Sequence, residues 1–211
     1  MKSDLVSNMQ LVFYPHPALR WVAKPVPKVT PLVQDVSHKM IEIMRSHNGI
    51  GLAATQVAIP WRIFVTCINN KELVFINPEV HLGRNKKDTN PRTSYEHELC
   101  LSLPGLQVHE PIPRSKDVYV SALDINGKNF VIAGPGIFSR VIQHENDHLN
   151  GILFFDHIQS SQPLEDWLNY LKVQYLNLTP DYSKKPTFGT NEEEIKKLVE
   201  LEELLKEMEN A

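Results

Sequence analysis

The residues around position 145 are of the types that bind a metal ion and move a proton. The run Gln143–His148 contains the pattern H-E-x-x-H. In an α-helix, residues four positions apart are turned by roughly 40° and lie about 6 Å apart along the axis. His144 and His148 could therefore bind the same ion, and the adjacent carboxylate of Glu145 could exchange protons with a bound water. The pattern indicates a metal-dependent hydrolase.

The surrounding sequence predicts the helix that this pattern needs. Gly134-Pro135-Gly136 precedes it, and Gly151 follows it at a position where a left-handed residue would close the last turn. Apolar residues and both histidines recur at steps of four, three and four, and so share one face: Ile137, Val141, His144 and His148. The alternative is a core helix with hydrogen-bonded histidines, which a pair of histidines with an intervening Glu makes less favourable.

A third metal ligand must come from elsewhere, because catalytic sites usually take three protein donors and keep an open position. Cys100 is the candidate, since a metal would deprotonate its thiol; the alternative is a packed thiol without a metal. The second cysteine, Cys67, lies inside a predicted strand and is better explained as a small core residue. The first ten residues lack the apolar run of a signal peptide, so we do not expect a disulfide between the two cysteines.

The segment Gly49–Gln56 combines small residues with one polar side chain. Its two glycines allow the backbone to approach another group closely. Gln56 could donate hydrogen bonds to a substrate oxygen. The alternative is a helix end followed by a tightly packed strand.

Composition narrows the classes of function. The 211 residues are 42% hydrophobic and 22% charged, as in ordinary globular proteins. A net charge of -3 predicts no direct nucleic-acid site and no attraction to a membrane surface. No segment approaches the run of about 18 apolar residues that spans a bilayer. We therefore expect a cytoplasmic protein.

Turn and cap signals divide the chain into elements. Thr30 is a suitable N-cap, with Pro31 at the first helical position. The elements expected are a helix from Pro31 that ends at Asn48-Gly49, a hairpin of Arg62–Ile68 and Glu72–Asn77, a hairpin of Asp117–Asp124 and Lys128–Ile132, and a short strand at Ile152–Phe155. Runs of strands between helices predict an α+β fold, with mostly antiparallel sheets packed around a central metal-binding helix.

The C-terminal part differs in composition from the rest. We expect a catalytic domain at residues 1–178 that includes a helix at 163–176, a linker at 179–191 and an acidic, amphipathic helical tail at 192–211. The tail carries eight Glu against three Lys, a net charge of -5. It would form a C-terminal helical extension that packs on the domain or binds a second chain or partner.

Three blocks, in this order, resemble the peptide deformylase family: G-x-G-x-A-A-x-Q at Gly49–Gln56, E-G-C-L-S at Glu98–Ser102, and the Q-H-E-x-x-D/H-H type at Gln143–Gly151. The resemblance extends from about Leu11 to Phe155. It implies a hydrolase that removes the formyl group from N-formylmethionine at the start of nascent polypeptides. It also implies one divalent metal ion, usually Fe²⁺, for which Zn²⁺, Ni²⁺ or Co²⁺ can substitute.

The resemblance also implies roles for particular residues. The metal ligands would be Cys100, His144 and His148, and Glu145 would be the general acid and base. The donors to the formyl oxygen would be Gln56 and the backbone N–H of Leu101. Gly49, Ile50 and Gly51 would line the substrate, and the pocket for the methionine side chain would contain Ile50, Ile137 and Val141.

Three positions depart from the family pattern. Leu99 replaces the glycine before the ligand cysteine, which could narrow access or alter the loop. Thr55 stands where proline is frequent, and Gln107 stands where arginine is frequent, so the support of Glu98 could differ. Every proposed catalytic group is nevertheless present.

Two other functions fit parts of the sequence. An H-E-x-x-H metallopeptidase would need a third ligand downstream, and His157 is the only later histidine. A deformylase-like protein without activity could bind nascent chains or make a transient ribosome contact through its acidic tail. The oligomeric state is not predicted.

Overall fold

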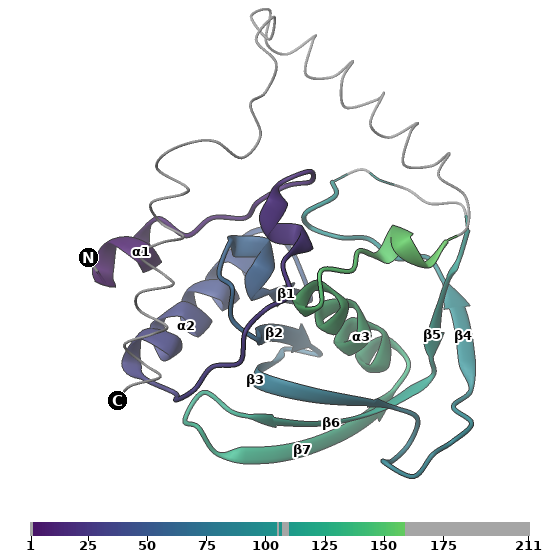
Figure 1. Cartoon of the computed structure of the whole chain (residues 1–211). Helices are drawn as coiled ribbons and strands as arrows, with labels where there is room; N and C mark the ends of the chain where they lie inside the picture. Colours follow the sequence, from purple (N-terminus) through teal and green to yellow (C-terminus); the bar gives the residue numbers. More distant parts are fainter. Residues whose placement is uncertain (1, 105, 107–109, 159–211) are drawn as a thin grey trace, which may run out of the picture.

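Two antiparallel sheets and three α-helices make up the fold in the part that the computed structural model describes, residues 2–104, 106 and 110–158 (Figure 1). The five-stranded sheet has the order β1-β2-β3-β6-β7, and β4 pairs with β5 in a second sheet. The strands are β1 (Gly51–Ala53), β2 (Ile63–Ile68), β3 (Lys71–Leu82), β4 (Thr93–Glu96), β5 (Ile112–Ser115), β6 (Asp117–Leu123) and β7 (Asn129–Pro135). The predicted α+β class and antiparallel sheets are confirmed.

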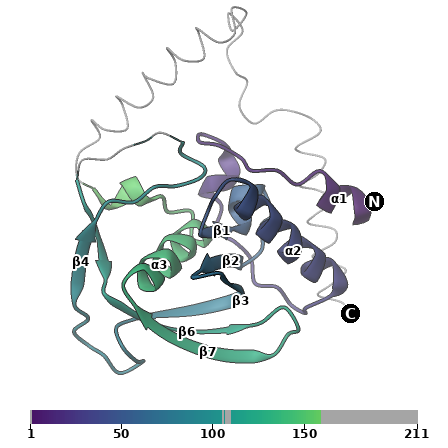
Figure 2. The same ribbon diagram turned by 180° about the vertical axis from the view of Figure 1, so that it is seen from behind.

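The helices lie on both sides of the short strands β1 and β2 (Figures 1 and 2). The α-helices are α1 (Lys2–Ser7), α2 (Pro31–Ser46) and α3 (Ile137–Leu149), and the 3-10 helices are η1 (Pro17–Arg20), η2 (Ala54–Val57) and η3 (Phe154–His157). α2 packs on one side of β1 and β2, whereas α3 contacts strands of both sheets. No helix among these described segments has the length and hydropathy of a bilayer span.

Local signals in the sequence account for the start of α2 and for both hairpins. The side chain of Thr30 accepts a hydrogen bond from the N–H of Val33, so the predicted N-cap is confirmed. Asn69 and Asn70 both have positive φ at the β2–β3 turn, as a two-residue hairpin turn of this type requires. Gly127, with φ of 75°, closes the β6–β7 hairpin.

The structure differs from the sequence-based expectation in several strands. The predicted strand at Ile152–Phe155 is wrong, because Asp156 accepts the N–H of Leu153 at 2.8 Å and the chain turns into η3. β3 continues past Asn77 through an irregularity in its register with β6. The β4–β5 pair was not predicted. The expected helix at 163–176, the linker at 179–191 and the tail at 192–211 lie outside the described residues.

α3 is held by a buried apolar face. Ile142 and Leu149 are fully buried in a cluster that also contains Phe64 and Phe75 from the five-stranded sheet. Gly136, with φ of 62°, precedes the helix, and Gly151, with φ of 71°, follows it, as the sequence predicted for the C-terminal end. Burying one face of α3 against the sheet fixes the direction in which its other side chains point.

Replacing Ile142 by Ala should therefore destabilise the protein by roughly 2–5 kcal/mol, because a cavity is left beneath the helix. Ile137→Ala makes the same chemical change in the same helix at a side chain that is 53% exposed, and should change stability by no more than about 0.5 kcal/mol. Urea unfolding of the two metal-free variants measures the difference. Equal losses would show that the Ile142 face does not hold the helix.

Candidate metal centre

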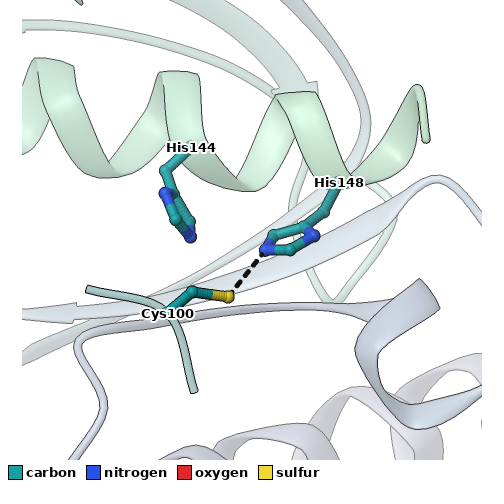
Figure 3. Close-up of side chains that lie close together, drawn as sticks. All are labelled: Cys100, His144 and His148. Carbon is teal, nitrogen blue, oxygen red and sulfur yellow. Dashed lines mark hydrogen bonds between the residues drawn. The ribbon is translucent and has the colours of Figure 1, made fainter. Parts of the chain in front are cut away.

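The fold brings Cys100, His144 and His148 together (Figure 3). One potential ligand atom of each residue lies within 4.8 Å of the other two, and Sγ of Cys100 is 3.3 Å from Nε2 of His148. All three residues are buried. The histidines come from successive turns of α3, and Cys100 comes from the loop between β4 and β5. A thiolate and two imidazoles at this spacing suit one divalent ion with a coordination position left open.

The two imidazoles have different electrostatic surroundings in the metal-free protein. Burial lowers the pKa of His148 well below its ordinary value, and the neighbouring His144 lowers it further. Burial acts in the same direction on His144, but its contacts with Cys100 and Glu98 raise its pKa well above the ordinary value. An ion that binds both imidazoles would therefore displace a proton from His144.

A carboxylate sets the orientation of the His144 ring. Oε2 of Glu98 lies 2.9 Å from Nδ1 of His144, so Nδ1–H donates to the carboxylate and Nε2 remains as the ligand atom. Such outer hydrogen bonds hold a metal-binding imidazole in one tautomer and one plane. The ring of His144 is therefore oriented before any ion binds.

Two arginines hold Glu98 in turn. Nε and Nη2 of Arg114 donate to the two carboxylate oxygens at 2.8 and 2.9 Å, and Nη1 of Arg140 donates to Oε1 at 2.7 Å. Burial alone would raise the pKa of Glu98, but the hydrogen bonds from Arg114 and His144 hold it well below its ordinary value. Glu98 therefore stays ionised at neutral pH.

Glu145 is in the opposite situation. It is 3% exposed, and its Oε2 atom is buried without a hydrogen-bond partner among the described residues. Burial raises the pKa of Glu145 to about 7, although the charge of His144 opposes the rise. A carboxyl group with such a pKa can both accept and donate a proton near neutral pH.

Gln56 presents an amide donor to the ligand cysteine. Its Oε1 accepts the N–H of Ala53 at 2.8 Å, which fixes the amide plane. Its Nε2 donates to Oγ of Ser102 at 3.2 Å and lies 3.6 Å from Sγ of Cys100. The fold thus holds this donor beside the candidate ligand.

The glycines of the first sequence block approach the candidate catalytic residues closely. A Cβ atom at Gly51 would lie 2.3 Å from Oε1 of Glu145, and one at Gly49 would lie 2.6 Å from Cδ1 of Leu101. Neither space admits a side chain without movement of its neighbour. This close approach, together with the strand β1 that begins at Gly51, explains the small residues of this block.

The apolar residues expected to contact substrate differ in exposure. Val141 is buried, whereas Ile50 and Ile137 are exposed at 45% and 53%. Leu99 is 77% exposed, so its side chain points to solvent. Oγ1 of Thr55 donates to the carbonyl oxygen of His148 at 3.1 Å and so satisfies a group at the end of α3.

The sequence did not reveal the roles of Arg114, Asp147 and His157. Nη1 of Arg114 donates to Oδ2 of Asp147 at 2.5 Å, and Nε2 of His157 lies 2.7 Å from the same oxygen. A cavity of about 450 Å³ is lined by all three. Gln107 lies outside the described residues, and Glu98 is supported by Arg114 and Arg140.

Comparison with known proteins identifies the relatives of this chain. A sequence profile described as polypeptide deformylase matches residues 8–163. The peptide deformylase of Borreliella burgdorferi is 40% identical over 153 residues, which cover 72% of this chain and 88% of that protein. Peptide deformylase 1 of Clostridium perfringens is 44% identical over 132 residues, which cover 62% of this chain and 81% of its own length.

Solved structures have the same fold. A Synechococcus elongatus peptide deformylase in complex with actinonin superimposes with a TM-score of 0.69 at 33% identity, covering 77% of this chain and 85% of that one. The Thermotoga maritima peptide deformylase gives a TM-score of 0.65 at 37% identity, covering 72% and 98%.

The environment of Glu98 leads to a pH-dependent stability. Glu98→Gln should lose roughly 3–5 kcal/mol at pH 7, because it removes the buried charge that pairs with the guanidinium groups of Arg114 and Arg140. Since the folded pKa is depressed, this contribution is fully present above the unfolded pKa of 4.5 and is lost as pH falls below it. Urea unfolding of the metal-free wild type and variant between pH 3 and 8 should therefore show curves that converge in acid.

Glu96→Gln is the matched control. Glu96 also pairs with Arg140, at 3.5 Å, but its side chain is 57% exposed. We expect a loss of no more than about 1 kcal/mol. A gap between wild type and Glu98→Gln that stays constant down to pH 3 would contradict the ionised Glu98.

Proposed function

This chain belongs to the polypeptide deformylase family, and we propose that Cys100, His144 and His148 hold its catalytic metal ion. The protein is a metal-dependent hydrolase that removes the N-formyl group from the N-formylmethionine of newly made polypeptides. The observation that carries the proposed ligand set is the approach of one thiol and two imidazoles to within 4.8 Å of one another. In this proposal α3 is the central metal-binding helix of the fold.

The donor set also bears on the identity of the metal. Two neutral imidazoles and one thiolate leave one net positive charge on a divalent ion, and these ligands suit Fe²⁺, Zn²⁺, Ni²⁺ and Co²⁺. We propose Fe²⁺ as the native ion, with the other three as substitutes. When bound, the ion acts as a Lewis acid that polarises a water molecule and the formyl carbonyl.

Glu145 is proposed to move the proton. Its carboxylate takes a proton from the attacking water, whose oxygen bonds to the formyl carbon. Nε2 of Gln56 and the backbone N–H of Leu101 donate hydrogen bonds to the formyl oxygen as negative charge develops there. The C–N bond then breaks, and Glu145 delivers its proton to the leaving amine. Formate and a free N-terminal methionine result.

The substrate is proposed to lie along Gly49, Ile50 and Gly51. The close approach of Gly49 to Leu101 and of Gly51 to Glu145 supports this path, because the backbone there adjoins the proposed catalytic groups. Ile50, Ile137 and Val141 would contact the methionine side chain.

We also propose the domain boundaries, the cytoplasmic location and the ribosome contact expected from the sequence. The family match ends at residue 163, which agrees with a catalytic domain that precedes a linker at 179–191 and a tail at 192–211. Nascent chains as substrates favour the cytoplasm and a transient ribosome contact. His157 contacts Asp147 rather than the ligand cluster, so the third ligand that a metallopeptidase would require is not supplied by this residue.

The ligand set predicts unequal effects of the two cysteines. Cys100→Ser should reduce the metal content of anaerobically purified protein at least about 10-fold, because a thiolate donor is lost. Cys67 lies half-buried in strand β2, and Cys67→Ser should leave the metal content unchanged. Metal analysis of both proteins measures this, and equal metal content would remove Cys100 from the site.

Glu145→Gln tests the proton carrier. The variant should keep its metal and lose at least about 100-fold in the rate of formate release from a formyl-Met peptide. Because burial raises the folded pKa of Glu145 to about 7, ionisation opposes folding above the unfolded value of 4.5. Metal-free Glu145→Gln should therefore be more stable than wild type at pH 8 and lose this advantage near pH 4.5. Full activity in the variant would exclude the proposed role.

A further inference from the structure

We propose that His157 is a positioning residue for His144, one of the ligands in the proposed function on which this inference rests. His157 bonds Asp147 and His144 bonds Glu98, so the two imidazoles are not in direct contact with each other through these bonds. They are joined by three intervening residues whose side chains form an unbroken series of ion pairs and hydrogen bonds: Asp147, Arg114 and Glu98.

The series begins where two donors meet on one oxygen. Oδ2 of Asp147 lies 2.7 Å from Nε2 of His157 and 2.5 Å from Nη1 of Arg114. An ionised carboxylate only accepts, so Nε2 of His157 must carry the proton. The 3.2 Å separation of His157 Nε2 from Arg114 Nη1 is then the spacing of two donors that converge on Asp147. His157 thereby helps to fix where this oxygen sits.

Arg114 transmits this position because its guanidinium is planar and rigid. Nη1 is directed at Asp147, while Nε and Nη2 donate to both oxygens of Glu98. The side chain of Arg114 is only 3% exposed, so water does not readily replace these partners. A rotation that follows a shift of Asp147 must therefore also turn the carboxylate of Glu98.

Glu98 is the last step, because Oε2 bonds both Nη2 of Arg114 and Nδ1 of His144. The charges along the series alternate: negative Glu98, positive Arg114 and negative Asp147. Loss of the donor at His157 would let Asp147 attract Arg114 more strongly and weaken the hold of Arg114 on Glu98. The imidazole of His144 would then be less firmly oriented.

His157 is not needed to hold its own helix. η3 is fixed by Asp156, which accepts the N–H of Leu153 and pairs with Arg20. The side chain of His157 is 30% exposed and borders the cavity of about 450 Å³. Its contact with Asp147, the shortest polar one that it makes within the described part of the chain, can therefore be altered separately from the folding of η3.

Two amide variants make a matched pair for the test. The amide nitrogen of Gln reaches the place of Nε2 of histidine, whereas that of Asn reaches only the place of Nδ1. Direct outer-shell partners are worth about 10–100-fold in metal affinity, and His157 acts through three intervening residues, so we expect the smaller effect of a 3–10-fold rise, roughly, in the metal dissociation constant of His157→Asn. His157→Gln should stay within about twofold of wild type. Competition of the Zn²⁺- or Co²⁺-loaded protein with a chelator measures both.

Asp156→Asn serves as the control for η3, because it weakens the anchor of this helix without touching Asp147. It should lower thermal stability and leave the metal dissociation constant unchanged. In the metal-free proteins, the NMR resonance of the His144 Nδ1 proton should shift in His157→Asn and not in Asp156→Asn.

Equal affinities of wild type and His157→Asn, or an equal effect of Asp156→Asn, would overturn the role of His157 while leaving the ligand set intact. If Cys100→Ser instead bound the metal as tightly as wild type, the ligand set would be wrong, and the role of His157 with it.

Discussion

A single buried carboxylate connects the parts of this protein that must act together. Glu98 lies two residues before Cys100, accepts hydrogen bonds from Arg114 of β5 and Arg140 of α3, and binds the ring of His144. Burying a charge is unfavourable unless it is paired and hydrogen-bonded, so these partners must assemble together. The loop that carries the thiol and the helix that carries the imidazoles are thereby held in one register.

The chemistry depends on giving two nearby carboxyl groups opposite environments. Glu98 is surrounded by donors and stays ionised, whereas Glu145 has a buried oxygen that no described residue pairs with and a pKa raised to about 7. One group can orient a ligand at every physiological pH, and the other can exchange a proton. Because Gly51 has no side chain, it leaves space for the carboxyl group of Glu145. The folded protein is less stable with this buried carboxyl group than it would be with a better-solvated one.

The sequence predicted what depends on neighbouring residues. Thr30 with Pro31, Asn69 with Asn70, and Gly151 mark helix ends and turns through backbone requirements that act within a few residues. It could not predict the pairing of Arg114 with Glu98 and Asp147, which are 16 and 33 residues away. Nothing beside Arg114 in the sequence marks its partners, and the packing of β5 against α3 brings it to the helix. The apolar run at Ile152–Phe155 likewise looked like a strand, because the turn depends on the one carboxylate that follows it.

The departure at Leu99 illustrates how structure resolves a question that a motif raises. A glycine before a ligand cysteine could be required for a left-handed backbone or for lack of space. Leu99 has no positive φ, and its side chain is 77% exposed. Neither requirement therefore applies in this chain. The backbone at Leu99 is one that any residue adopts, and the side chain of Leu99 points to solvent, whereas Cys100 is buried.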